Sequence, residues 1–253
     1  MSAYLPQDLV DRLRQIPVDQ NLLVCCDFDG TLAPIVTRPE DARPLPGTGM
    51  LLLRLAETPA THVAVVSGRS LSDLETLSGF AEPLVLVGSH GGEFTSGFVS
   101  DLTPRQEDLL RELDEVLSRM ISDAPGAELE RKPLSIAVHV RQAARSDADR
   151  VLAAVREGPA LWPGVHATAG KEVLELAVQQ VDKGSAVESL RHRYGRDTAV
   201  VFIGDDVTDE RAFGVLGAED VGIKVGEGAT AAEYRVPDVS SVPSILMLLA
   251  ALR

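Results

Sequence analysis

The chain has 253 residues, of which 45% are apolar and 25% charged, and its formal net charge is −14 at pH 7. This length and apolar content suffice for a buried core in one large domain or two moderate ones, which argues against a disordered chain. The negative charge argues against nucleic acid or an anionic membrane as the main partner, because both favour basic surfaces.

The expected compartment follows from the two ends of the chain and from its cysteines. Residues 1–20 lack the apolar core of a signal peptide, and the longest apolar run near the end, 245–252, is too short to span a bilayer. The two cysteines, Cys25 and Cys26, are adjacent in an apolar run, and this favours small buried thiols in a reducing compartment over a disulfide or metal site. We expect a soluble, cytoplasmic and monomeric protein.

The first predicted strand, residues 22–26, runs directly into Asp27-Phe28-Asp29-Gly30-Thr31-Leu32. Side chains two residues apart in an extended backbone project to the same side, so Asp27 and Asp29 can address one reacting centre. Gly30 allows the chain to turn sharply after them. Open α/β sheets bind ligands at the carboxyl ends of their strands, where these carboxylates stand. Taken alone, the pattern is also that of an ordinary turn rich in Asp and Gly.

Three further motifs follow in chain order. A predicted strand at 62–66 ends in Ser67-Gly68-Arg69, which supplies a hydroxyl, a glycine and a cation. Lys183 opens a predicted helix that extends to Tyr194. A strand at 199–203 ends in the acidic sequence Gly204-Asp205-Asp206-Val207-Thr208-Asp209-Glu210. A nucleophile, a hydroxyl, a lysine and an acidic cluster at strand ends and a helix start together indicate a phosphoryl-transfer site.

The pattern of apolar residues predicts an α/β fold with a Rossmann-like core around a parallel sheet. In the first part of the chain, strands alternate with helices, at 22–26, 49–57, 62–66, 71–77 and 84–87. After the middle of the chain, the same alternation resumes with a helix from 183, a strand at 199–203, a helix at 209–216 and a strand at 221–225. We expect a core catalytic domain formed by residues 1–99 and 180–253.

Residues 100–179 are expected to form a second, smaller domain that is inserted into the core. The order of its elements changes to αββαββ, with helices near 109–121 and 147–157 and strands near 127–131, 134–141, 165–168 and 172–177. Along 134–141, apolar residues alternate with polar ones. One face of the strand should therefore pack on helices, while the other carries His139 and Arg141.

Taken in order, the four motifs resemble those of the haloacid dehalogenase superfamily of phosphatases. The acidic motif followed by Arg211-Ala212-Phe213 is similar specifically to that of trehalose-6-phosphate phosphatases. The resemblance spans most of residues 22–225. It implies a Mg²⁺-dependent phosphoric monoester hydrolase with a Rossmann-like core and an inserted cap, which converts trehalose 6-phosphate to trehalose and inorganic phosphate.

The resemblance also implies a role for each acidic residue of the core motifs. Asp27 would attack phosphorus and form an aspartyl-phosphate, and Asp29 would protonate the leaving sugar oxygen and then activate water. Mg²⁺ prefers oxygen ligands, here the carboxylates of Asp27 and Asp205 and the backbone carbonyl of Asp29. Asp206 and Asp209 would support these ligands from an outer shell.

The remaining core residues would bind phosphate. Hydrolysis of a phosphate monoester needs up to ~10²¹-fold acceleration, obtained mainly by positioning and by neutralising charge. The hydroxyl of Ser67, the N–H of Gly68 and the cations of Arg69 and Lys183 would hold the phosphoryl oxygens. Ser67 and Lys183 are therefore expected to act in catalysis together with the two aspartates.

Substrate specificity is expected in the cap, because the core motifs specify the chemistry but not the alcohol that leaves. The resemblance to cap motifs of the same family implies that Glu130, Lys132 and Glu175 contact the sugar. Further candidate substrate contacts are His139, Arg141, Lys171 and, where core becomes cap, His90. A sheet face lined with charged residues is also the usual appearance of a solvated face.

Several other functions fit parts of the pattern. A phosphatase for sucrose phosphate or a glycosyl-glycerate phosphate would use the same motifs, and a sugar phosphomutase would retain the phosphoryl group instead of releasing it. A signalling domain phosphorylated on aspartate, or a catalytically silent binding protein, are alternatives of another class. Signalling receivers lack both an aspartate two residues after the phosphorylated one and an inserted cap. The presence of every motif residue argues against a silent relative.

Overall fold

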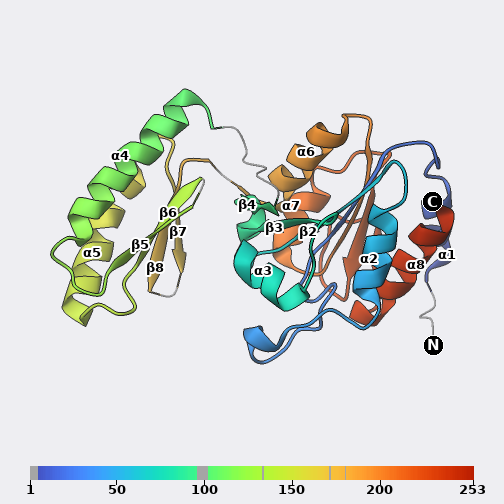
Figure 1. The fold of residues 1–253 in the computed structure, drawn as a ribbon, viewed down its shortest axis with the longest axis horizontal. Coiled ribbons are helices and arrows are strands. Elements are labelled where there is room, and N and C mark those ends of the chain that lie inside the picture. Colours follow the sequence, from blue (N-terminus) through green and yellow to red (C-terminus); the bar gives the residue numbers. More distant parts are fainter. Residues whose placement is uncertain (1–4, 96–101, 133, 171, 180) are drawn as a thin grey trace. The chain divides into compact units, whose positions relative to one another are not determined.

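The structure is a computed structural model that describes residues 5–95, 102–132, 134–170, 172–179 and 181–253. The chain divides into two compact units, which we call the core unit (residues 1–98 and 181–253) and the inserted unit (residues 99–180). In the described residues, the core unit contains a seven-stranded sheet and the inserted unit a four-stranded sheet (Figure 1). No helix among the described residues is both long enough and apolar enough to cross a membrane.

The sheet of the core unit has β1 at its centre. Its strands are β1 (Leu22–Cys26), β2 (Thr61–Val66), β3 (Val85–Gly88), β4 (Glu93–Phe94), β9 (Ala199–Gly204), β10 (Val221–Val225) and β11 (Tyr234–Val236). They lie in the order β11-β10-β9-β1-β2-β3-β4, and all neighbours are parallel except β3 and β4. The parallel arrangement brings the carboxyl ends of β1, β2 and β9 together at one edge of the sheet.

Helices cover both faces of this sheet. They are α1 (Gln7–Arg14), α2 (Thr48–Ala56), α3 (Leu71–Ser78), α6 (Lys183–Tyr194), α7 (Glu210–Phe213) and α8 (Val242–Leu252). Leu22, Val24 and Cys26 of β1 pack in a core with α1, α2, α3 and α8. Leu23 and Cys25 face the other way, toward α6 and α7. Burial on both faces explains why β1 is apolar at every position.

The inserted unit is an antiparallel sheet with helices on one face. Its elements are α4 (Pro104–Ile121), β5 (Glu128–Arg131), β6 (Ser135–His139), α5 (Arg145–Glu157), β7 (His166–Gly170) and β8 (Val173–Ala177), and the strand order is β5-β6-β8-β7. Ile136 and Val138 of β6, with Leu174 and Leu176 of β8, pack in one core with α4 and α5. The side chains that alternate with them point to the opposite face.

The predicted fold class is confirmed, including the αββαββ order of the insertion. The predicted elements do not include α1, α8, β4 or β11, and the helix expected at 209–216 is a 3-10 turn, Val207–Asp209, followed by the short α7. Asp209 accepts the backbone N–H of Asp206, which stabilises the turn, and Gly214 follows α7 directly. Glycine disfavours continuation of a helix because it loses more backbone entropy than other residues. The division into a catalytic core and a specificity cap stays a prediction.

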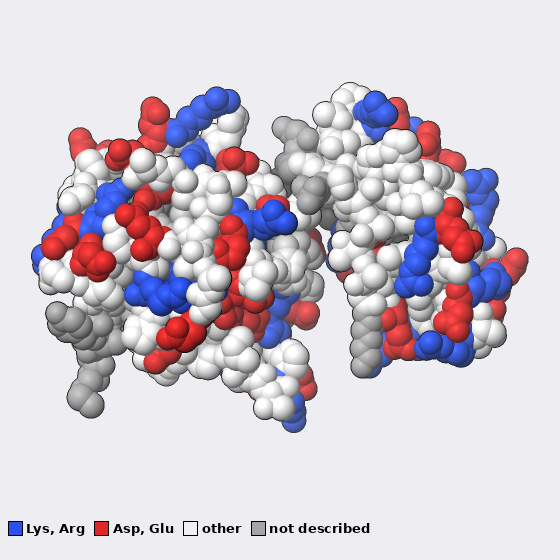
Figure 2. All heavy atoms as spheres, turned by 180° about the vertical axis from the view of Figure 1, so that it is seen from behind, with Lys and Arg blue, Asp and Glu red and all other residues white. Residues whose placement is uncertain are grey.

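Acidic and basic side chains are interspersed over both units on the face shown in Figure 2. Some form exposed pairs within one helix, such as Arg14 with Asp11 and Arg145 with Asp149. Pairs of this kind contribute at most about 1 kcal/mol each to stability. On a chain of net charge −14, an anionic ligand needs cations gathered at a specific site.

Candidate functional site

A cavity of about 530 Å³ lies in the core unit, at the carboxyl ends of β1, β2 and β9. Its lining residues are Asp27, Asp29, Ile35, Pro39, Ser67, Gly68, Arg69, His90, Lys183, Asp205, Asp206 and Thr208. Every site residue predicted for the core is in this lining except Asp209, which is fully buried and contacts Lys183. The fold therefore brings together four motifs that are far apart in the sequence.

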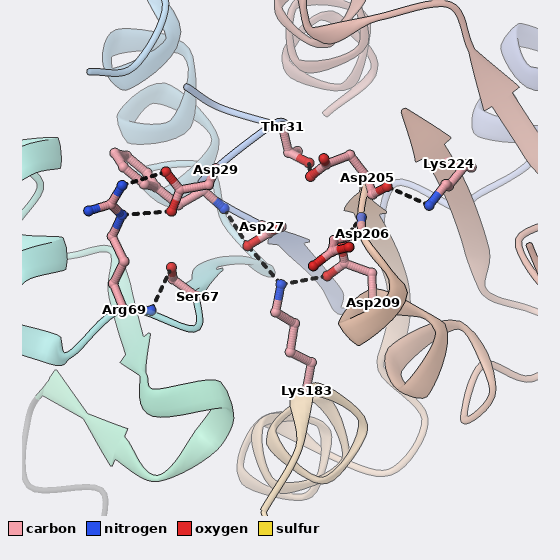
Figure 3. A network of polar contacts seen from close by, with 11 residues as sticks. Asp27, Asp29, Thr31, Ser67, Arg69, Lys183, Asp205, Asp206, Asp209 and Lys224 are labelled. Carbon is pink, nitrogen blue, oxygen red and sulfur yellow. Dashed lines mark hydrogen bonds and ion pairs between the residues drawn. The ribbon is translucent and has the colours of Figure 1, made fainter. Parts of the chain in front are cut away.

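Lys183 lies between two buried carboxylates (Figure 3). Its Nζ is 2.8 Å from Asp27 Oδ1 and 2.7 Å from Asp209 Oδ1, and all three side chains are at most 5% exposed. Burial by itself would lower the pKa of Lys183, but the two carboxylates outweigh it and raise the pKa, so the ammonium stays charged. Lys183 is the first residue of α6. The side chain of Asp182 caps this helix by accepting the backbone N–H of Ser185.

Asp27 is held at the end of β1 by its own backbone. Its N–H donates to the carbonyl of Ile203 at 2.9 Å, and its Oδ1 accepts the N–H of Phe28 at 2.7 Å. Burial raises the pKa of Asp27 well above its ordinary value, because Lys183 offsets only part of the desolvation and Asp209 adds negative charge. A further cation beside Asp27 would favour its ionised, nucleophilic form.

Asp205 is in close contact with residues of the first motif. A Cβ atom at Gly30, whose φ is +84°, would lie 2.0 Å from Asp205 Oδ2, so this close approach requires glycine. Thr31 Oγ1 donates to Asp205 Oδ1 at 3.2 Å. The Nζ of Lys224 donates to the backbone carbonyl of Asp205 at 2.5 Å (Figure 3). These three contacts set the position of the Asp205 carboxylate relative to Asp27.

The acidic side chains fit a divalent cation. Oxygen atoms of Asp27, Asp205 and Asp209 lie within 4.8 Å of one another, and hard cations prefer such donors. Burial and the charge of Asp209 raise the pKa of Asp205 too, which indicates more negative charge than Lys183 balances. Asp209 is already engaged at both oxygens, by Lys183 and by the N–H of Asp206. The geometry thus favours Asp27 and Asp205 as ligands, with Asp209 as their support.

Asp29 and Arg69 form a bidentate ion pair at the cavity (Figure 3). Nε of Arg69 is 2.6 Å from Oδ2 of Asp29, and Nη2 is 2.7 Å from Oδ1. The hydrogen bonds to Asp29 raise the pKa of Arg69 further. The guanidinium also lies over the ring of Phe28, 5.8 Å from the ring centroid. The sequence places both residues at the site but does not predict that they are each other's partners.

Ser67, Gly68 and His90 form another side of the cavity. Ser67 is 1% exposed, and its Oγ accepts the backbone N–H of Arg69 at 3.2 Å. A Cβ atom at Gly68 would lie 2.4 Å from the ring of His90, so any larger residue there would displace this ring. The N–H of His90 donates to the carbonyl of Ser67 at 2.9 Å. His90 itself has φ of 58°, a left-handed conformation that non-glycine residues rarely adopt.

Several residues at the site are absent from the sequence-based prediction: Ile35, Pro39 and Thr208 in the lining, and Thr31 and Lys224 beside Asp205. Thr31 lies inside the first motif, but its hydroxyl was assigned no role. Lys224 is 4% exposed in β10, and its Nζ is also 3.7 Å from Oε1 of Glu210. A lysine within an otherwise apolar strand is an unusual feature, since lysine is almost never fully buried without a partner. That signal could have identified Lys224.

The inserted unit carries a polar cluster, defined as Glu130, Lys132, Ser135, His139 and Glu175, on the sheet face opposite its helices. The register places Glu130 and Glu175 on either side of the same residue of β6. Nε2 of His139 is 2.9 Å from Glu130 Oε2, and Nζ of Lys132 is 3.4 Å from Glu175 Oε1. Ser135 Oγ donates to Glu175 Oε1 at 2.6 Å. Strand pairing therefore does bring four of the predicted sugar contacts together.

Arg141, another predicted contact, is not in this cluster. Arg141 is exposed in the turn after β6, beyond the strand alternation that was expected to place it beside His139. Strand β6 ends at His139 because the chain turns there, and Val140 instead donates its N–H to the carbonyl of Glu172. Lys171 lies outside the described residues.

Comparison with known proteins identifies the family. The model of the trehalose-phosphatase family matches residues 25–240, which is most of the chain. The chain belongs to the trehalose-phosphatase family. The predicted resemblance is thereby confirmed. The match of the trehalose-phosphatase model begins inside β1 and ends after β11, so it includes all four motifs and the whole inserted unit.

Individual members of the trehalose-phosphatase family are similar in sequence and in structure. A trehalose-phosphate phosphatase of Mycobacterium tuberculosis is 35% identical over 233 residues, which cover 85% of this chain and 58% of that protein. The corresponding protein of Mycobacterium avium is 37% identical over 228 residues, covering 82% and 56%. A structure of Aspergillus fumigatus trehalose-6-phosphate phosphatase is 26% identical with a TM-score of 0.64, covering 99% of this chain and all of that one. The chain thus spans little more than half the length of these mycobacterial relatives.

Proposed function

We propose that the protein hydrolyses trehalose 6-phosphate to trehalose and inorganic phosphate. Membership of the trehalose-phosphatase family supports the sugar phosphate as substrate class. The observation that carries the chemistry is the buried Asp27, which lies at the end of β1 beside the ammonium of Lys183 and lines the same cavity as Ser67 and Arg69. A carboxylate held among cations and hydroxyls is suited to attack on a phosphoryl group.

Asp27 acts as the nucleophile in this proposal. Its oxygen forms a bond to phosphorus while the bond from phosphorus to the sugar oxygen breaks, and an aspartyl-phosphate results. Asp29, two residues after Asp27 in the turn that follows β1, gives a proton to the leaving sugar oxygen and then takes one from the attacking water. Ser67, the N–H of Gly68 and the ammonium of Lys183 hold the phosphoryl oxygens. Arg69 is a further phosphate contact.

The acidic residues of the site are proposed to bind Mg²⁺. Asp27 and Asp205 would supply carboxylate oxygens and Asp29 its backbone carbonyl, while Asp206 and Asp209 support these ligands. When bound, Mg²⁺ would supply positive charge that offsets the charge of the phosphoryl group. Thr31 and Lys224 hold Asp205 in place for this purpose, through the contacts at its carboxylate and its backbone carbonyl.

The polar cluster of the inserted unit is proposed to bind the sugar. Glu130 and Glu175 can accept hydrogen bonds from sugar hydroxyls, and Lys132 and His139 can donate to them. Lys132, whose ammonium lies between the two carboxylates at 3.4 and 4.0 Å, sets their separation. His90 at the cavity, together with Arg141 and Lys171, completes the proposed set of substrate contacts.

The test is the release of inorganic phosphate from a panel of sugar phosphates. Trehalose 6-phosphate is compared with glucose 6-phosphate, sucrose 6-phosphate and mannose phosphates, each with Mg²⁺ and with a chelator. A strong, metal-dependent preference for trehalose 6-phosphate supports the proposal. Preference for another ester would keep Asp27 and its partners but overturn the sugar assignment. Retention of the phosphoryl group on a product sugar would indicate a mutase instead.

A further inference from the structure

The contacts of Asp29 conflict with the role proposed for it. An acid must present one oxygen, with its proton, to the leaving group. Both oxygens of Asp29 instead accept hydrogen bonds from one guanidinium, at 2.6 and 2.7 Å. Each oxygen of Asp29 therefore already uses one lone pair for the guanidinium, and the carboxylate is held as the acceptor of a cation. We expect Asp29 to act as an acid only after it has separated from Arg69.

The surroundings of Arg69 point to what that event is. Arg69 lines the same cavity as Lys183 and Ser67, and its backbone N–H is already bonded to the Ser67 hydroxyl. A guanidinium presents a planar fork of N–H donors that binds a carboxylate or a phosphate equally well in geometry. A phosphoryl dianion carries more charge than the carboxylate of Asp29 and can therefore compete for the fork.

Burial distinguishes this ion pair from the other one at the site. The side chains of Arg69 and Asp29 are 15% and 32% exposed, so they can separate without opening the core. Lys183 and its partners are at most 5% exposed and have no such freedom. The ring of Phe28 lies under the guanidinium and gives it an apolar surface on which to change partner.

We propose that Arg69 exchanges partners during the reaction. Before the substrate binds, Arg69 donates hydrogen bonds to both carboxylate oxygens of Asp29. When the substrate binds, the guanidinium donates to the phosphoryl oxygens instead and releases Asp29. Binding of the phosphoryl group thus frees the acid that the first step needs. This inference rests on the proposed function and adds to it an order of events. Water that enters without a phosphoryl group finds Asp29 still paired with Arg69.

A double-mutant cycle with inorganic phosphate as the ligand tests the exchange. Calorimetry in the presence of Mg²⁺ compares the full chain with Asp29→Asn, Arg69→Ala and the double variant. If Asp29 competes with phosphate for Arg69, Asp29→Asn should bind phosphate roughly tenfold more tightly, since removal of a competing state restores the intrinsic affinity. In the Arg69→Ala background the same change at Asp29 should alter the affinity less than about twofold.

Three results would overturn the exchange. An equal gain in both backgrounds would mean that Asp29→Asn acts only by removing a negative charge near the anion, without Arg69. No gain at all, or no phosphate binding by any variant, would mean that Arg69 does not pass from one partner to the other. Asp29→Ala repeats the test with a side chain that cannot accept a hydrogen bond. Asp11→Asn on α1, which removes the same charge from an exposed pair, should leave the affinity unchanged.

Failure of the partner exchange can be distinguished from failure of the proposed function. The cycle uses inorganic phosphate, so it does not depend on which ester is hydrolysed. Failure of the proposed function would instead be seen as no phosphate release from trehalose 6-phosphate by the unaltered chain. Arg69→Lys provides a further check, because a single ammonium cannot engage both oxygens of Asp29 in the bidentate way.

Discussion

The cavity of the core unit and the polar cluster of the inserted unit both place a lysine between two carboxylates, but they differ in burial. Lys183, Asp27 and Asp209 are at most 5% exposed, whereas Glu175 is 33% and Glu130 49% exposed beside Lys132. Buried charges are held rigidly and interact strongly, which suits them to stabilise a transition state. Exposed groups are solvated until a ligand replaces the water. The core unit is therefore suited to chemistry and the polar cluster to recognition.

The largest effect is expected for Asp27→Asn in the core unit. The change keeps the volume of the side chain but removes the proposed nucleophile, so kcat for trehalose 6-phosphate should fall by about a thousandfold or more. Phosphate release measures the loss, and urea unfolding checks that the variant remains folded. A variant that retains turnover within about tenfold of the unaltered chain would contradict the covalent route.

Lys183 and Lys132 should differ in how much each contributes to the stability of the protein. Lys183→Met leaves two buried carboxylates without their cation, and we expect the free energy of unfolding to fall by about 3–5 kcal/mol. Lys132→Met is the matched control, because its carboxylate partners remain partly in contact with water, and it should cost no more than about 1 kcal/mol. Urea denaturation of both variants measures the difference. Equal costs would show that burial does not distinguish the two sites.

Substitutions in the polar cluster should change the affinity for the substrate. Glu175→Gln removes the charge of a proposed sugar contact, and KM for trehalose 6-phosphate should rise roughly tenfold with little change in kcat, as loss of a charge-assisted hydrogen bond predicts. Glu157→Gln, at an exposed position of helix α5 on the other face of the sheet, is the control and should leave KM unchanged. A fall in kcat at unchanged KM would assign Glu175 to catalysis instead of recognition.

The smallest effect is expected for the thiols. Cys25 and Cys26 both lie in β1, and burial raises the pKa of each well above its ordinary value near 9.0. The reactive thiolate is therefore absent from the folded protein, and a disulfide reagent should modify neither cysteine until the core unit unfolds. Because the unfolded thiols ionise above pH 9 while the folded ones do not, stability should fall as the pH rises past 9. Rapid labelling of the native protein by the reagent would contradict the expected protection of the two thiols.

The ends of strands were the most predictable part of the site. Asp27, Ser67 and Asp205 follow apolar runs that can only be buried strands, and parallel strands bring their carboxyl ends to one edge. The alternation of apolar and polar residues likewise identified the sheet faces of the inserted unit. Partners were not predictable in the same way. The pairing of Arg69 with Asp29, and the contact of Lys224 with the Asp205 carbonyl, depend on approach across the fold.

The α/β architecture, the inserted module and most of the polar residues at the cavity could therefore be predicted from the sequence, because they follow from local periodicity and from strand connection rules. Which charges are paired, and how deeply each pair is buried, can be seen only in the tertiary structure. Those properties depend on distances of a few ångströms between segments more than a hundred residues apart, such as Asp27 and Lys183. Electrostatic interactions change steeply with separation and burial, so a list of residues does not specify them.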